Sequence, residues 1–131
     1  MHRRLNEQQK ESIEGGRIVT KVYVAGKLNA DAPNYIKNCH AMITKAERIR
    51  RFGFSVYVPC LDFLSGLVAG DYEYSDYFEN NIAWLECADF LFVCPNSEDS
   101  TGTQAEIEHA KKKGIPIAYS MDELIKLKAE K

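Results

Sequence analysis

Residues 89–120, DFLFVCPNSEDSTGTQAEIEHAKKKGIPIAYS, decide the fold of this 131-residue chain. The segment opens with successive apolar residues, as in a strand buried on both faces of a parallel sheet. A helix over about residues 102–113 follows, closed by Gly114, and a second apolar strand, IPIAYS, starts at Ile115. Two strands joined through a helix form a right-handed crossover between parallel neighbours. The segment therefore predicts one βαβ unit.

The rest of the chain repeats this alternation. Strands are expected at residues 18–26 and 54–59, which are rich in β-branched and aromatic residues. Helices are expected at residues 34–52 and 75–87, which carry apolar residues at helical spacing. We therefore predict an α/β fold with three layers, flavodoxin-like or Rossmann-like. Its open parallel sheet has four strands in the order 2-1-3-4, with helices on both faces.

Capping signals mark two of the expected helices, whereas residues 60–74 give no clear assignment. Ser75 can cap the helix that runs to about Cys87. Ser120 and Glu123 have the spacing of a capping box, which predicts a last helix after the fourth strand.

Length and composition limit the number of domains and the classes of binding partner. We expect residues 18–131 to form a single domain and residues 1–17 to be a mobile tail. The formal net charge of -2 provides no excess of basic residues for a DNA or RNA polymer. The four cysteines lack metal-ligand spacing, and no apolar run has the length of a membrane helix. A cytoplasmic protein with reduced cysteines and no membrane association is expected.

In such a sheet the ligand site lies beyond the carboxyl ends of the strands, where the strand order reverses. Here that point brings together the loop after Gly26 and the loop after Pro95. The second loop leads into a helix near Ser100 and Gly102. Free backbone N–H groups and a partial positive charge at a helix N-terminus favour a phosphate or another anion.

Glu106 has two interpretations at this stage. Thr103 and Glu106 have the spacing of a capping box, in which the glutamate turns back to its own backbone. Alternatively, the carboxylate lies at the mouth of the crevice and attacks a sugar carbon or stabilises a sugar cation. Spacing alone leaves both interpretations open.

Three stretches together resemble the nucleoside 2-deoxyribosyltransferase-like family. They are KVYVAG from residue 21, YIKNCHAMITKAERIRRFGFSVYVP from residue 35, and ENNIAWLECADFLFVCPNSEDSTGTQAEIEHAKKKGIPIAY from residue 79. The family includes deoxyribosyltransferases and hydrolases that split the N-glycosidic bond of nucleoside 5'-monophosphates. The most specific element is the S-x-G-x-x-x-E pattern of Ser100, Gly102 and Glu106.

The resemblance implies roles for individual residues. Glu106 matches the nucleophilic glutamate of the family, and Ser100 matches a serine that binds the 5'-phosphate in its nucleotide hydrolases. Tyr23 and Gly26 match the first-strand loop that packs beside the sugar, although Tyr23 also has an interpretation as a strand aromatic that fills the core. The family uses no metal or organic cofactor, takes a nucleoside or nucleotide as substrate, and commonly forms homodimers or larger homo-oligomers.

The chain departs from the family pattern at Asn81, where many members carry an aspartate that helps to bind or protonate the base. An asparagine can hydrogen-bond a base but cannot donate a proton as an acid does. The base would then be activated by Asp89, Asp76 or water, or would leave without activation. Asp89 is equally well interpreted as a polar residue that starts a strand and holds a neighbouring loop. Tyr77, with Tyr72 and Tyr74, is a candidate for stacking on the base or for packing a subunit interface.

Three functions follow from these observations. The leading hypothesis is an enzyme that cleaves or transfers the N-glycosidic bond of a nucleoside or its 5'-monophosphate through a carboxylate nucleophile. The second is a non-catalytic module that binds or senses a nucleotide, made plausible by Asn81. The third is a phosphoribohydrolase of the cytokinin-releasing type, because GTQAE at residues 102–106 also resembles its G-T-x-x-E motif.

Overall fold

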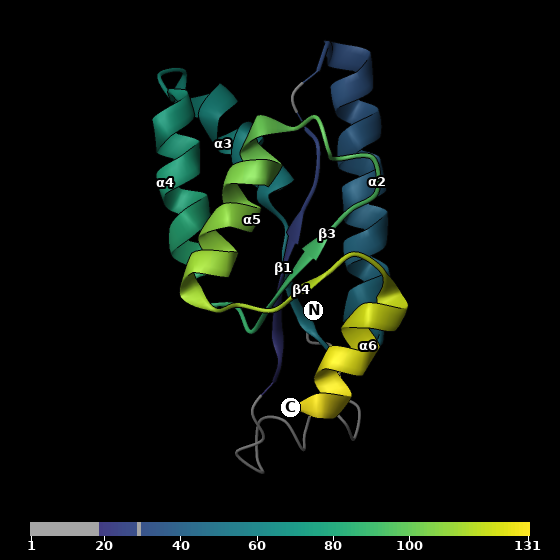
Figure 1. Ribbon diagram of the computed structural model, residues 1–131. Helices are drawn as coiled ribbons and strands as arrows, with labels where there is room; N and C mark the ends of the chain where they lie inside the picture. Colours follow the sequence, from purple (N-terminus) through teal and green to yellow (C-terminus); the bar gives the residue numbers. More distant parts are fainter. Residues whose placement is uncertain (1–18, 29) are drawn as a thin grey trace, which may run out of the picture.

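The computed structural model describes residues 19–28 and 30–131, so the tail expected at residues 1–17 lies outside the described residues. Four parallel strands form one sheet in the order β2-β1-β3-β4. They are β1 (Lys21–Ala25), β2 (Ser55–Tyr57), β3 (Phe90–Val93) and β4 (Ile117–Ala118). The predicted strand order is confirmed, and Figure 1 shows the central place of β1 and β3.

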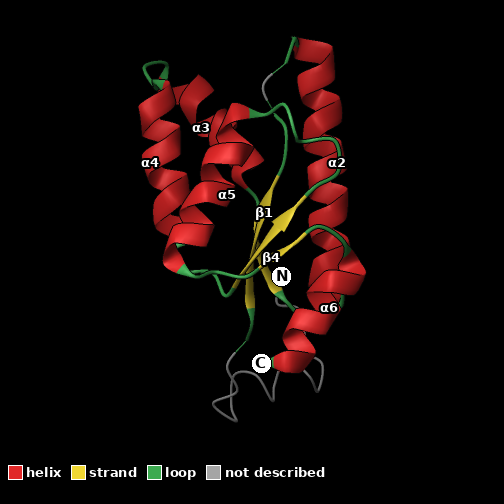
Figure 2. Cartoon of the chain, in the orientation of Figure 1, coloured by secondary structure: helices red, strands yellow, loops and turns green. Residues whose placement is uncertain are grey.

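Helices cover both faces of the sheet. Alternating side chains of β1 divide the core, with Val22 and Val24 in one cluster and Tyr23 and Ala25 in the other. The first cluster is closed by α2 (Ala32–Arg51) and α6 (Met121–Glu130), and the second by α4 (Tyr74–Leu85) and α5 (Thr101–Lys113). Figure 2 shows the two pairs of helices on either side of the strands. The predicted three-layer α/β architecture is therefore confirmed.

The two outer strands are shorter than the sequence predicts. Residues 55–57 pair with β1, against an expected strand of 54–59, and β4 contains only two residues. Short edge strands limit the unpaired backbone that the sheet offers to other chains. Within the described part of the chain, no helix combines the length and the apolar composition needed to cross a membrane.

The helix caps differ in part from those expected. Ser75 is not a cap but lies inside α4, whose N-cap is Glu73. The Asp76 carboxylate accepts the Glu73 N–H at 2.8 Å, so an acidic pair replaces the expected serine. Ser120 does cap α6, since its Oγ accepts the Glu123 N–H at 3.2 Å. The Glu123 carboxylate accepts the N–H of Tyr119 rather than that of Ser120.

The segment left unassigned in the sequence forms η1 (Pro59–Leu61) and α3 (Asp62–Ala69). Gly66 brings α3 against α4, because a Cβ on Gly66 would stand 1.6 Å from the Tyr77 hydroxyl oxygen. Only a residue without a side chain allows this approach.

Gly66→Ala is expected to destabilise the protein by about 1–3 kcal/mol, because the new methyl group displaces the Tyr77 ring. Alanine normally stabilises a helix relative to glycine, so the informative result is whether the free energy of unfolding falls rather than rises. Gly102→Ala in α5 is the matched control, since its Cβ would meet nothing nearer than the Tyr74 hydroxyl at 3.8 Å. Urea unfolding of both variants checks this, and equal effects would contradict the close contact.

Candidate functional site

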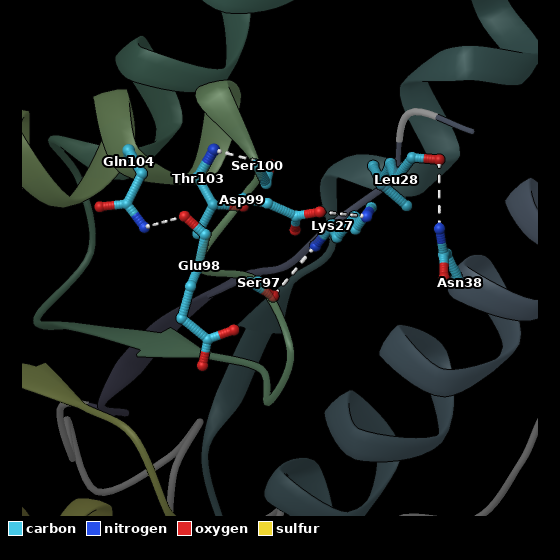
Figure 3. Close-up of polar contacts among 9 residues, drawn as sticks. All are labelled: Lys27, Leu28, Asn38, Ser97, Glu98, Asp99, Ser100, Thr103 and Gln104. Atoms are coloured by element: carbon cyan, nitrogen blue, oxygen red, sulfur yellow. Dashed lines mark hydrogen bonds and ion pairs between the residues drawn. The ribbon is translucent and has the colours of Figure 1, made fainter.

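Two loops meet at the carboxyl ends of β1 and β3. The Lys27 backbone N–H donates to Ser97 Oγ at 3.1 Å, and Lys27 Nζ forms an ion pair with Asp99 at 2.6 Å (Figure 3). Lys27 follows Gly26, and the two acceptors follow Pro95. The predicted juxtaposition of these loops at the reversal of strand order is confirmed.

The N-terminus of α5 is capped by Ser100 rather than by Thr103. Ser100 has an extended backbone, and its Oγ accepts the Thr103 N–H at 3.2 Å (Figure 3). Because α5 begins at Thr101, Thr103 lies within its first turn. The capping box of Thr103 and Glu106 is therefore wrong, and the Glu106 side chain is available for another contact.

That contact is with β1. Tyr23 donates its hydroxyl hydrogen to Glu106 Oε2, across 83 positions of the sequence. Both side chains are buried, with 8% of Glu106 and none of Tyr23 exposed. The strand pattern turns Tyr23 toward α5, and the helix places Glu106 on its buried face with Ile107 and Ala110. The carboxylate thus points into the protein toward the sheet.

Burial changes the ionisation of both groups. It raises the pKa of Glu106 to about 7, and the hydrogen bond from Tyr23 opposes this rise. Burial and the nearby Glu106 charge raise the pKa of Tyr23 well above its usual value. Tyr23 therefore remains a hydrogen-bond donor at neutral pH, whereas Glu106 is divided between its acid and its carboxylate form.

An aromatic stack extends from Tyr23 toward the surface. The ring of Tyr57 lies 5.4 Å from that of Tyr23 and 5.6 Å from that of Trp84, centre to centre. The Tyr57 hydroxyl donates to Asp62 Oδ2 at 2.9 Å, and Asn80 Nδ2 donates to the same oxygen at 3.2 Å. Glu106 is therefore linked to Asp62 through two tyrosines.

A cavity of about 730 Å³ opens beside this stack. Its walls come from α3, α4 and the loop between them, and they include Asp62, Asn80 and the predicted substrate residue Tyr77. The other lining residues are Ser65, Asp71, Tyr72, Asp76 and Glu79. Glu106 is not part of the wall, because Tyr23 and Tyr57 lie between it and Asp62. The cavity carries four carboxylates and no basic residue.

Sequence reasoning missed Tyr57, Asp62, Asn80 and Trp84. Asp62 offered a signal, because it follows the carboxyl end of the second strand, where ligand sites of parallel sheets gather. Asn80 and Trp84 offered none beyond their helical spacing. Their contacts join segments that are distant in sequence.

Asp89 lies apart from the other candidates. It precedes β3, accepts the Lys21 N–H at 2.8 Å and forms an ion pair with Lys131 at 2.8 Å. These contacts are at the amino ends of β1 and β3, opposite the loops that carry Lys27 and Asp99. The structure thus does not bring Asp89 to Glu106, and its contacts fit the interpretation as a residue that starts a strand.

Three further candidates have distinct surroundings. Gly26 allows close packing, since a Cβ there would stand 3.0 Å from Met42 Cε and 3.1 Å from Cys94 Cβ. Gly102, in the first turn of α5, lies next to the Tyr74 hydroxyl. Asn81 is half-buried, and its Oδ1 is shut off from solvent without a hydrogen-bond partner among the described residues.

Comparison with known families assigns most of the chain. Residues 20–119 match the family model described as a domain of unknown function, DUF4406. The chain belongs to the DUF4406 family. Comparison of this DUF4406 domain with curated proteins gives no match.

A solved structure shares the fold of the DUF4406 domain. It is a 2-deoxyribosyltransferase from the psychrotolerant bacterium Bacillus psychrosaccharolyticus. The TM-score is 0.54, with 24% sequence identity, and the match covers 75% of this chain and 69% of the other. At this identity the likeness establishes the fold that the two chains have in common.

The stability of the DUF4406 domain should fall as pH rises through about 7, the pKa of buried Glu106. Because the folded pKa exceeds the unfolded one, the protonated form stabilises the fold fully below about pH 4.5. This stabilisation, about 3 kcal/mol, is lost as Glu106 ionises. Glu106→Gln keeps an acceptor for Tyr23 without ionising.

Urea unfolding from pH 5 to pH 8.5 should therefore show a decline for the wild type that is absent in Glu106→Gln. Glu108→Gln, at an exposed position of the same helix, serves as the control and should retain the decline. Parallel curves for wild type and Glu106→Gln would contradict the shifted ionisation.

Proposed function

We propose that this DUF4406 domain cleaves or transfers the N-glycosidic bond of a nucleoside or a nucleoside 5'-monophosphate, with Glu106 as the nucleophile. The observation that carries the proposal is the buried carboxylate of Glu106, bound by Tyr23 and with no basic partner among the described residues. A carboxyl group of this kind is costly to ionise and is therefore a candidate for chemistry. The shared fold with a 2-deoxyribosyltransferase supports the same conclusion.

The reaction would proceed in two displacements at the sugar carbon C1'. Glu106 Oε1 forms a bond to C1' as the C1'–N bond breaks, and the base leaves with the electron pair and takes a proton from water. The resulting hydroxide then bonds to C1', and the carboxylate departs. In transfer, the nitrogen of a second base attacks instead and loses its own proton.

Tyr23 would support both steps without moving. Its hydroxyl donates to Oε2, which leaves Oε1 for the attack. When the sugar ester forms, Oε2 becomes a carbonyl oxygen that accepts the same hydrogen bond. The donor therefore stabilises the free carboxylate and the ester in turn.

The charges around the site favour a substrate without a phosphate. Lys27, in the loop after β1, is already paired with Asp99. The nearby cavity presents carboxylates, including Asp62 and Asp76, which repel an anion. An uncharged nucleoside avoids this repulsion, whereas the 5'-monophosphate remains the poorer substrate.

A non-catalytic nucleoside-binding module is the second candidate. It is favoured by the low exposure of Glu106, which is 8%, and by its position outside the cavity wall. Catalysis requires Tyr57 or the segment of α3 and α4 to shift so that a sugar reaches Oε1. Binding without this shift would give thermal stabilisation by nucleosides with no release of base.

Glu106→Gln is expected to reduce base release by at least about 10³-fold, because an amide is a poor nucleophile. A panel of nucleosides and their 5'-monophosphates, followed by chromatography of free base, measures this. The nucleosides should be the better substrates. Glu108→Gln, exposed on the same helix, should keep full activity.

The covalent step can be seen separately. Acid quenching during turnover, followed by peptide mass analysis, should find one sugar on the peptide that contains Glu106. Base release that persists in Glu106→Gln would refute the nucleophile, and intact nucleosides throughout would favour the binding module.

A further inference from the structure

Two buried polar atoms lack a hydrogen-bond partner within the described part of the chain. They are Thr103 Oγ1 and Asn81 Oδ1. Thr103 is only 1% exposed, so bulk solvent does not reach its hydroxyl group. Buried polar groups in folded proteins are nearly always bonded, and an exception requires an explanation such as a bound ligand.

Thr103 lies beside Glu106. The two residues are three positions apart in α5, and both belong to its buried face. Side chains of a helix tilt toward its N-terminus, so Thr103 occupies the side of Glu106 that faces the loop end of the sheet. The hydroxyl is therefore placed next to the reactive carboxyl group.

Asn81 lies on the neighbouring helix, α4. The helices α4 and α5 run side by side, as Figure 1 shows. Near the N-termini of the two helices, the Tyr74 hydroxyl approaches Gly102. Near their C-termini, Glu86 and His109 form a hydrogen bond of 2.8 Å. Along α4, Asn81 lies between the residues that make these two contacts, and its neighbour Ile82 packs in the cluster that contains Tyr23.

The chemistry of the two atoms selects the group that would bind them. Asn81 Oδ1 can only accept a hydrogen bond, whereas the Thr103 hydroxyl can donate and accept. A phosphate oxygen only accepts and would leave Asn81 unmatched. An ammonium group, or the exocyclic amino group of a base, only donates and would leave the Thr103 hydrogen unmatched. One alcohol hydroxyl can donate to Asn81 and accept from Thr103.

We infer that Thr103 and Asn81 form a subsite for a sugar hydroxyl next to the carbon that Glu106 attacks. The inference rests on the proposed function, and it makes Thr103 a specificity-determining residue. It also explains why the free protein tolerates two unmatched polar atoms, because substrate binding supplies their partner.

Thr103→Val tests the subsite, because valine keeps the branched shape and removes the hydroxyl. The variant should unfold at the same urea concentration as the wild type or a higher one. Its kcat/KM for the nucleoside that the wild type cleaves best should fall roughly three- to tenfold. Thr101→Val, exposed in the same turn, is the control and should change neither quantity.

The 2'-, 3'- and 5'-deoxy analogues of that nucleoside identify the hydroxyl. The loss caused by Thr103→Val should disappear for one analogue, and Asn81→Leu should give the same pattern. A clear loss of stability in Thr103→Val, or an equal loss of kcat/KM with every analogue, would overturn the subsite.

Binding measurements separate this inference from the proposed function. Thermal stabilisation of Glu106→Gln by the same compounds reports binding without chemistry. Adding Thr103→Val to that variant should weaken the stabilisation by the parent nucleoside but not by the matching deoxy analogue. If the double variant is stabilised by the parent nucleoside as strongly as Glu106→Gln alone, the subsite is refuted. A lack of base release by the wild type would instead count only against Glu106 as the nucleophile.

Discussion

The hydrogen bond between Tyr23 and Glu106 joins the central strand to the crossover helix and holds an ionisable group inside the protein. It depends on the strand order, because β1 lies next to β3 and the alternation of β1 turns Tyr23 toward α5. A carboxyl group at this depth without a cation is unfavourable when charged. The fold therefore maintains a destabilising feature in its buried interior.

The surroundings of this pair have a consistent electrostatic character. Lys27, in the loop after β1, forms an ion pair with Asp99. The cavity beside the aromatic stack is lined by carboxylates. Thr103, one turn before Glu106 in α5, and Asn81 in α4 instead contribute neutral polar atoms that are buried. These features underlie our proposal of a neutral, hydroxyl-bearing substrate rather than a phosphorylated one.

Local patterns predicted much of the fold but little of the site. The end of α5 at Gly114, which has a positive φ of 74°, could be predicted, and so could the cap of α6 at Ser120. Each of these features depends only on residues that are close in the sequence. Glu106 and Tyr23 were identified singly, yet their contact spans the sheet and no local pattern encodes it. The link from Tyr57 to Asp62 and Asn80 was missed for the same reason. Ser75 failed as a cap because the acidic pair of Glu73 and Asp76 places the N-cap of α4 two residues earlier, at Glu73.

Direct titration of Glu106 tests whether its carboxyl group is buried and bound by Tyr23. Carbon-13 NMR of the labelled side-chain carboxyl group should give a pKa of about 7 in the wild type. Tyr23→Phe removes the hydrogen bond that opposes the effect of burial, so its Glu106 pKa should be higher still, whereas Tyr119→Phe at an exposed position should leave it unchanged. A Glu106 pKa near 4.5 in both wild type and Tyr23→Phe would contradict the buried, tyrosine-bound carboxylate on which the account depends.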